Sequence, residues 1–378
     1  MNDPRITRLE LGTLEGTRPR PAGSNARLGA HGSIVRVPIA RIATEDGWTG
    51  FGRCTATREL LAPLVGMRLR EAFLPGGPAD AWLPCEFPLW DLAAKRAGLP
   101  VYALAAAMAN APVDGPLRVP CYDTSLYFDD LHLESDAAAA ALIAAEAGEG
   151  IGRGHRAFKI KIGRGARHMP LEAGVRRDVA IMRAVREAVG PDTRIMVDAN
   201  NGYNLNLTKR VLAETADVGL FWLEEAFHED PVLYSDLKDW LAARGLDVLI
   251  ADGEGQAAPD LLDWARDGLV DVVQYDIFSY GFTRWLATGR QLDAWGSRTA
   301  PHHYGTHYGN YATCHLAEAI HGFLFVEWDE ASTPGLDASG YRIEDGFVVV
   351  PAAPGFGLDL DQERFRQAVA ASGFALRA

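Results

Sequence analysis

Short apolar runs alternate with longer helix-forming stretches from about Val119 onward. This alternation indicates parallel strands joined by helical crossovers, in a sheet that is buried on both faces. Eight runs within about 220 residues match the size of a (β/α)8 barrel. We therefore predict an α/β fold of (β/α)8-barrel type. The runs are Cys121–Ser125, Ala157-Phe158, Ile195–Val197, Leu220–Leu223, Val248–Ile250, Val272-Val273, Thr299-Ala300 and Phe323–Val326.

The residues on either side of this region have a different pattern. Residues 34–42 and the tract around Phe51 read as a hairpin turning at Asp46-Gly47, and 87–97 read as a helix. Residues 18–33 are rich in Arg, Pro and Gly and have no period, which predicts a loop. We expect an α+β region over 1–118, the barrel over 119–338 with helices such as 171–188, 257–267 and 309–320, and a hairpin-containing segment over 339–378 that leaves the barrel.

Charge and cysteine content narrow the class of protein. The chain has 37 Lys and Arg against 50 Asp and Glu, a formal net charge of −13, which argues against binding to nucleic acid or a membrane surface. The four cysteines form no C-x-x-C pair, which favours a reducing compartment. The sequence shows no signal peptide and no apolar run long enough to span a bilayer, so we expect a cytoplasmic protein.

Acidic residues follow three consecutive runs. Asp198 and Glu224 directly follow the third and fourth runs, and Glu254 comes shortly after the fifth, at intervals of 26 and 30 residues. The carboxyl ends of parallel barrel strands meet on one rim, where active sites form. Each residue alone could be a helix N-cap or a solvated loop residue, but successive strand ends favour convergence. Three oxygen ligands without paired cysteines suit Mg²⁺ better than Zn²⁺.

Two lysines and a histidine complete the candidate site. Lys159 and Lys161 share one face of the second strand, where buried ammonium groups need carboxylate partners; the alternative is an edge strand with solvated lysines. His302 follows the seventh strand and Asp276 the sixth, an arrangement in which a carboxylate orients an imidazole base. His303 and His307 remain alternatives to His302. Glu327 follows the eighth strand.

These residues together resemble the enolase superfamily and, within it, the mandelate racemase subgroup. Lys159-Ile160-Lys161 resembles the Lys-x-Lys motif of the second barrel strand. Residues 89–102 resemble the end of the family's capping domain, and Pro354–Gly357 its C-terminal Pro-Gly-x-Gly motif. Residues 271–283 contain no lysine of the kind that the muconate cycloisomerase subgroup carries there. The resemblance implies that residues 1–118 cap the barrel and that residues 339–378 return to this capping domain.

The resemblance also implies a role for each site residue. Asp198, Glu224 and Glu254 match the ligands of one Mg²⁺ ion, and Lys161 and the Asp276–His302 dyad match the bases on opposite faces of the substrate. Glu327 matches the acid that hydrogen-bonds a substrate carboxylate oxygen, helped by Lys159. The ion and these groups would stabilise the enediolate formed when a proton leaves the carbon beside the carboxylate.

The resulting expectation is a lyase that dehydrates an acid sugar, an aldonate or aldarate, to a 2-keto-3-deoxy product. A racemase or epimerase of a 2-hydroxy acid is the first alternative, and an inactive enolase-like binding protein is the second. The expected partner is a small-molecule carboxylate, and the family resemblance implies a homo-oligomer. Polar residues within 15–33 can hold hydroxyls or a distal carboxylate; these are Arg18, Arg20, Asn25, Arg27 and His31.

Overall fold

The computed structural model describes residues 3–109, 111, 113 and 115–378. Its described part contains a set of eight parallel strands in the order β13-β6-β7-β8-β9-β10-β11-β12. Hydrogen bonds between Thr299 and residues 322 and 324 link the β12 end to the segment that enters β13. The predicted barrel class is therefore confirmed. The strands are β6 (Arg118–Leu126), β7 (Ala157–Lys161), β8 (Arg194–Asp198), β9 (Leu220–Glu224), β10 (Leu249–Asp252), β11 (Val272–Val273), β12 (Arg298–Thr299) and β13 (Val326–Trp328).

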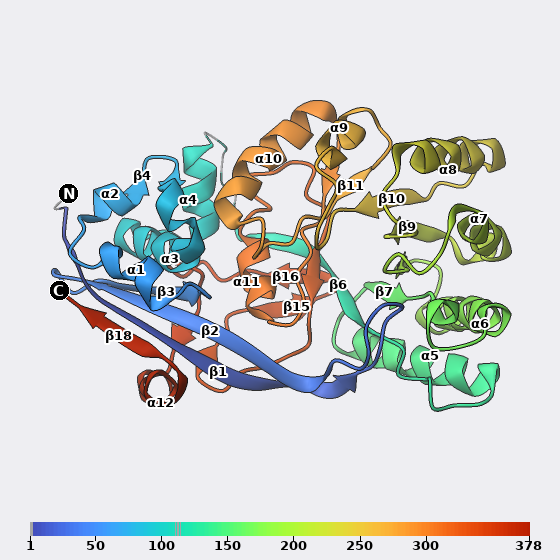
Figure 1. Cartoon of the computed structure of the whole chain (residues 1–378), viewed down its shortest axis with the longest axis horizontal. Helices are drawn as coiled ribbons and strands as arrows, with labels where there is room; N and C mark the ends of the chain where they lie inside the picture. The colour runs from blue at the N-terminus through green and yellow to red at the C-terminus, as the bar shows by residue number, and fades with distance from the viewer. Residues whose placement is uncertain (1–2, 110, 112, 114) are drawn as a thin grey trace.

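Helices follow the strands and cover the outer face of the sheet (Figure 1). Three predicted elements have different limits. The helix expected over 257–267 begins only at Leu261, because the chain enters it through Pro259, which disfavours helical geometry in the preceding residue. The helix expected over 309–320 spans Tyr308–Cys314 and continues as i→i+3 turns, and the eighth strand lies at 326–328 instead of 323–326. The helices are α5 (Asp136–Gly152), α6 (Leu171–Val189), α7 (Leu205–Glu214), α8 (Pro231–Arg244), α9 (Leu261–Arg266), α10 (Phe282–Trp295) and α11 (Tyr308–Cys314).

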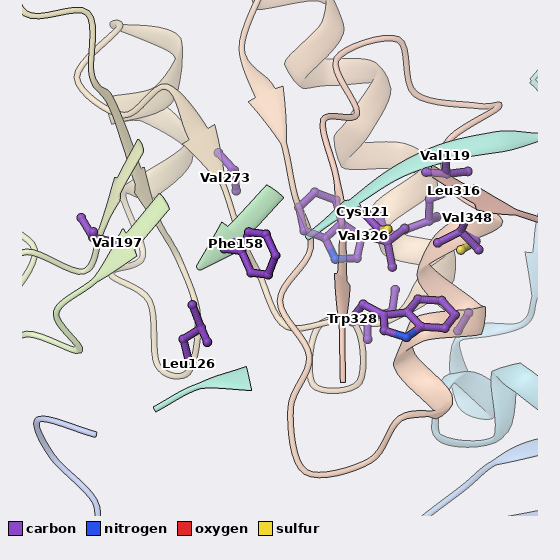
Figure 2. Close-up of a cluster of buried hydrophobic side chains, with 14 of the residues drawn as sticks. Val119, Cys121, Leu126, Phe158, Val197, Val273, Leu316, Val326, Trp328 and Val348 are labelled. Carbon is purple, nitrogen blue, oxygen red and sulfur yellow. The ribbon is translucent and has the colours of Figure 1, made fainter. Parts of the chain in front are cut away.

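The barrel has an apolar layer inside and an apolar layer between its strands and helices. The inner layer takes a buried side chain from each strand region: Tyr122, Ala157, Met196, Trp222, Ala251, Val272, Ala300 and Phe325. The outer layer includes Phe158, Val197 and Val273 (Figure 2). Since strand side chains alternate, Lys159 and Lys161 point to the same side as Ala157, the barrel interior.

A long hairpin joins the N-terminal region to the barrel. Strands β1 (Ile6–Ala22), β2 (Gly32–Thr44), β3 (Thr49–Arg53) and β18 (Phe374–Arg377) form an antiparallel sheet in the order β18-β1-β2-β3, and the far end of the β1–β2 hairpin extends to the barrel (Figure 1). The prediction of a loop over 18–33 is wrong at both ends, because Arg18 belongs to β1 and Ser33 to β2. Antiparallel pairing, with a bulge between Thr17 and Ala22, holds these polar residues in strands despite their composition.

The other N-terminal and C-terminal elements pack on this sheet or extend the barrel sheet. After β3 come the short elements α1 (Arg58–Leu61), α2 (Leu69–Ala72), β4 (Phe73–Leu74) and β5 (Gly77–Pro78). The helices α3 (Glu86–Ala97) and α4 (Val101–Met108) follow them, and α3 packs against β2 and β3. The predicted helix at 87–97 and both predicted hairpins are confirmed. β15 (Arg342–Glu344) and β16 (Phe347–Val349) extend the barrel sheet from β6, whereas α12 (Gln362–Ser372) and β18 pack on β1. The exact domain limits stay a prediction. No helix in the described part of the chain has the length and apolar character needed to cross a membrane.

Glu86 joins the N-terminal region to the barrel. Its buried carboxylate accepts hydrogen bonds from the backbone N–H groups of Phe282 and Thr283 at 2.8 Å, and from the Thr283 hydroxyl at 2.6 Å. Trp90 donates to the same hydroxyl at 2.9 Å. The first turn of α10, which follows the strand end that carries Asp276, is thus capped by a side chain from α3.

We expect Glu86→Ala to lower the free energy of unfolding by about 2 kcal/mol, because buried N–H donors of α10 lose a charged acceptor. Chemical denaturation measures this. Glu187→Ala, on the exposed surface of α6, is the control and should change stability by less than about 0.5 kcal/mol. Equal effects of the two substitutions would show that the α3–α10 contact does not stabilise the fold.

Candidate active site

Three carboxylates meet at the carboxyl ends of β8, β9 and β10. Asp198 and Glu224 are the last residues of their strands, and Glu254 lies two residues beyond β10. One oxygen of each lies within 4.8 Å of the others. Asp198 and Glu224 are fully buried. Three converging carboxylates suit a hard divalent cation, which prefers oxygen ligands and offsets their mutual repulsion.

The backbone beside these carboxylates is strained. Four described non-glycine residues have positive φ, and three of them are Asn200 (43°), Asn201 (59°) and Glu225 (41°). The Asn200 side-chain amide donates to Glu225 at 2.9 Å and to Glu254 at 3.2 Å. This geometry costs free energy at each position, and here it directs the groups that follow β8 and β9 toward Glu254.

Lys159 and Lys161 lie inside the barrel, as predicted, and both are buried against carboxylates. Lys159 Nζ lies 2.7 Å from Glu224 and 3.1 Å from Glu327, and Lys161 Nζ contacts Asp198. Burial alone lowers the pKa of Lys159, but the carboxylates outweigh burial and raise it above its ordinary value. The same balance, with Asp198 as the main partner, raises the pKa of Lys161. The alternative of two solvated lysines is wrong.

His302 lies on the other side of Glu254. Its Nδ1 is 3.1 Å from Asp276 Oδ2, and its Nε2 is 3.1 Å from Glu254 Oε2. Burial lowers the pKa of His302, but Glu254, Glu327 and Asp276 together raise it to about 10. Asp276 also accepts two backbone N–H bonds from residues 278 and 279, which fix its position. Asp276 therefore orients the ring of His302 while the other ring nitrogen faces the carboxylate cluster.

The other two histidines have different positions. His303 donates its backbone N–H to Glu327 Oε2 at 2.9 Å, and its Nε2 lies 2.5 Å from the Glu327 carbonyl oxygen. His307 is buried, and burial lowers its pKa to about 4. Of the three neighbouring histidines, His302 is the one that contacts both Glu254 and Asp276.

Glu327 lies opposite Glu224 across Lys159. Its Oε1 accepts a hydrogen bond from the Thr124 hydroxyl at 2.6 Å and lies 3.1 Å from Lys159 Nζ. Burial raises the pKa of Glu327, but Lys159 and His302 outweigh it and hold the pKa well below its usual range. The structure thus brings together all eight residues that the sequence predicted for the site.

The sequence interpretation missed groups that fix these carboxylates. Gln274 donates to Glu224 Oε2 at 3.0 Å, Trp222 donates to the same oxygen at 3.2 Å, and Thr124 donates to Glu327. Gln274 directly follows the β11 run and Thr124 lies near the end of β6, so strand-end position was an available signal. Trp222 gave no such signal, because it reads as an ordinary core residue.

Comparison with known proteins places this geometry in a family. The model of the enolase C-terminal domain-like family matches residues 141–364. Structures of a galacturonate dehydratase from a Geobacillus species are 50% identical to this chain. One, a mutant complexed with Mg, has a TM-score of 0.96 and covers 99% of this chain and 97% of its own. Another, complexed with D-galacturonate and 5-keto-4-deoxy-D-galacturonate, has a TM-score of 0.95 and covers all of both chains.

A curated relative agrees with this assignment. The arabinonate dehydratase of Saccharolobus solfataricus is 26% identical over 88% of this chain and 90% of its own length. The family model covers more than half of the chain, and the site residues occur in the order that the resemblance implied. The chain belongs to the enolase superfamily, in its mandelate racemase subgroup.

Proposed function

We propose that the protein is a Mg²⁺-dependent hydro-lyase that dehydrates an acid sugar at the two carbons nearest its carboxylate. The observation that carries this proposal is the carboxylate cluster of Asp198, Glu224 and Glu254 with Lys161 on one side and His302 on the other. The relative that is 50% identical is a dehydratase bound to a uronate and its deoxy-keto product. D-galacturonate is therefore the first compound to test.

Asp198, Glu224 and Glu254 would hold the ion. When bound, Mg²⁺ supplies positive charge that attracts the substrate carboxylate, stabilises negative charge developing on it and lowers the pKa of the neighbouring cationic side chains. Lys159 and Glu327 are placed to contact the same carboxylate. Lys159 would act as a charged donor, and Glu327 would donate after taking up a proton, because the incoming negative charge raises its pKa.

Lys161 and His302 carry the proton transfers. One removes the proton from the carbon beside the carboxylate, and negative charge develops on the carboxylate oxygens. The bond from the next carbon to its hydroxyl then breaks, and the hydroxyl takes a proton from the other residue, or from the one that removed the first proton, and leaves as water. The resulting enol becomes a ketone, so the net change is loss of one water. With no leaving group in place, the same two residues would instead exchange the proton between faces, which is the racemase alternative.

Incubation with Mg²⁺ and a panel of uronates, aldonates and aldarates tests the proposal, with 2-keto acid formation as the readout. We expect at least one compound to give a keto acid. A panel without any product, using protein of confirmed fold and Mg²⁺ content, would overturn the dehydratase assignment.

The metal site has a test of its own. We expect Glu254→Gln to weaken Mg²⁺ binding at least about 100-fold, because a charged oxygen ligand is lost. Calorimetric titration with Mg²⁺ alone measures this without any substrate. Glu187→Gln, far from the site, should leave affinity unchanged; unchanged affinity in Glu254→Gln would exclude Glu254 as a ligand.

We expect Lys161→Met and His302→Asn each to lower kcat by about 10²- to 10⁴-fold, the usual contribution of a general acid or base. Initial rates of keto-acid formation measure the effect, and thermal unfolding checks the fold. The matched controls are Lys209→Met, at a half-buried lysine of α7 paired with Asp236, and His321→Asn, at an exposed histidine. A variant at Lys161 or His302 that keeps more than about a tenth of wild-type kcat would remove that residue from the proton-transfer step.

A further inference from the structure

His31 lies beside Lys161, in the connection between β1 and β2. Its ring makes T-shaped contacts with the rings of Tyr127 and Tyr304, with ring centres 5.1 Å apart in each case. The two tyrosine rings stack on each other with centres 5.2 Å apart. Lys161 Nζ lies 5.4 Å from the centre of the Tyr127 ring. Aromatic contacts of this kind hold the imidazole next to one of the two proposed bases.

The connection that carries His31 is well fixed. The His31 N–H donates to the Ala22 carbonyl at 3.0 Å, and Asn25 Oδ1 accepts the backbone N–H of Leu28 at 2.7 Å. Phe128, which follows β6, donates its N–H to the Ser24 carbonyl at 2.9 Å. The backbone of the loop that carries the imidazole is thereby tied to the barrel.

One ring nitrogen of His31 is buried without a hydrogen-bond partner in the described part of the chain. His31 Nε2 is buried and has no hydrogen-bond partner among the described residues. A buried polar atom without a partner costs free energy, which a bound ligand with a hydrogen-bonding group can recover. Nε2 is therefore available to an oxygen atom of the substrate.

The charges near His31 define what kind of oxygen this can be. Burial, with Lys161 and Arg18, lowers the pKa of His31 to about 4, so the ring is neutral at neutral pH. Arg18 is bound by Asp329 through two bonds of 2.9 and 2.7 Å, and Lys161 contacts Asp198. Arg18 is thus already paired with Asp329, and Lys161 is uncharged when it acts as the proposed base, so neither offers a free positive charge. The position therefore favours an uncharged group over a second carboxylate, which would lose its hydration without gaining a partner.

We propose that His31 contacts the substrate and is a specificity residue: its Nε2 hydrogen-bonds an uncharged oxygen of the acid sugar, on the side of Lys161 away from the metal carboxylates. This inference rests on the proposed function and deepens it. It assigns the substrate to the monocarboxylates, uronates or aldonates, whose far end is an aldehyde or an alcohol, and disfavours aldarates.

Three compounds of identical hydroxyl configuration test the proposal: D-galacturonate, its C1 reduction product L-galactonate, and its C1 oxidation product galactarate. Each is given to the Mg²⁺-loaded full chain. KM and kcat are measured for every compound that is turned over, and calorimetry gives Kd for every compound that is not. If none is turned over, the galacto configuration is not that of the substrate, and the broader panel decides the dehydratase proposal. The binding constants still decide the role of His31.

We expect the better of the two monocarboxylates to have a KM or Kd at least about tenfold lower than galactarate. His31→Phe, which keeps an aromatic ring but no nitrogen, should raise that constant about tenfold, the loss of one buried hydrogen bond, with a smaller change in kcat. Galactarate should change by less than about twofold. His31→Asn, which keeps a hydrogen-bonding group, should be less affected than His31→Phe.

His132→Phe is the matched control, at an exposed histidine in the loop after β6, and should change none of these constants. Thermal unfolding checks that each variant is folded. Binding of galactarate as tight as that of both monocarboxylates would overturn the assignment of substrate class, and that comparison needs only the wild-type chain. If KM and Kd are unchanged in a folded His31→Phe variant, Nε2 binds only water and not the substrate.

Discussion

The charge balance inside the barrel rim is the interaction on which the rest of the site depends. Lys159 and Lys161 project from β7 above an apolar layer and would be costly to bury alone. Asp198, Glu224 and Glu327 pair with them from β8, β9 and β13. Carboxylates and lysines therefore hold each other at the same level of the barrel. Glu254 contacts His302 instead.

Neutral hydrogen-bond donors hold the charged groups of the site in place. Carboxylates that face cations and one another must be kept from rearranging, and neutral donors do this. Gln274 and Trp222 fix one oxygen of Glu224, Thr124 fixes one of Glu327, and Asn200 links Glu225 to Glu254. The positive φ of Asn200 and Glu225 is the backbone cost of that arrangement.

The N-terminal region contributes residues that contact the barrel beside the site. The β1–β2 hairpin carries Arg18 to Asp329, which follows β13, and places His31 beside Lys161. At the other end, Glu86 caps α10, the helix after the strand end that bears Asp276. These contacts join both sides of the site to the N-terminal region, outside the barrel.

Most residues of the site could be predicted from the sequence, because strands that follow one another in the chain lie side by side in the barrel. Asp198, Glu224 and Glu254 could be brought together from their position after successive apolar runs, and Lys159 and Lys161 from alternation alone. The extent of β1 could not, because pairing with β2 overrides the polar composition of residues 18–22. The sequence named His31 only as one of five polar residues within 15–33. It could not single out His31, because the proposed role depends on contacts between the β1–β2 connection and two barrel loops, at Tyr127 and Tyr304.

We propose that a Mg²⁺ ion held by three carboxylates between two bases makes the proton beside the substrate carboxylate acidic, and that its removal leads to loss of water. Proton NMR of D-galacturonate with the protein in D₂O, with Mg²⁺ or with EDTA, tests it most directly. We expect, with Mg²⁺ only, loss of the signal of the proton beside the carboxylate together with the appearance of the deoxy-keto product. Loss of that signal with EDTA, or exchange for deuterium without loss of water, would contradict it.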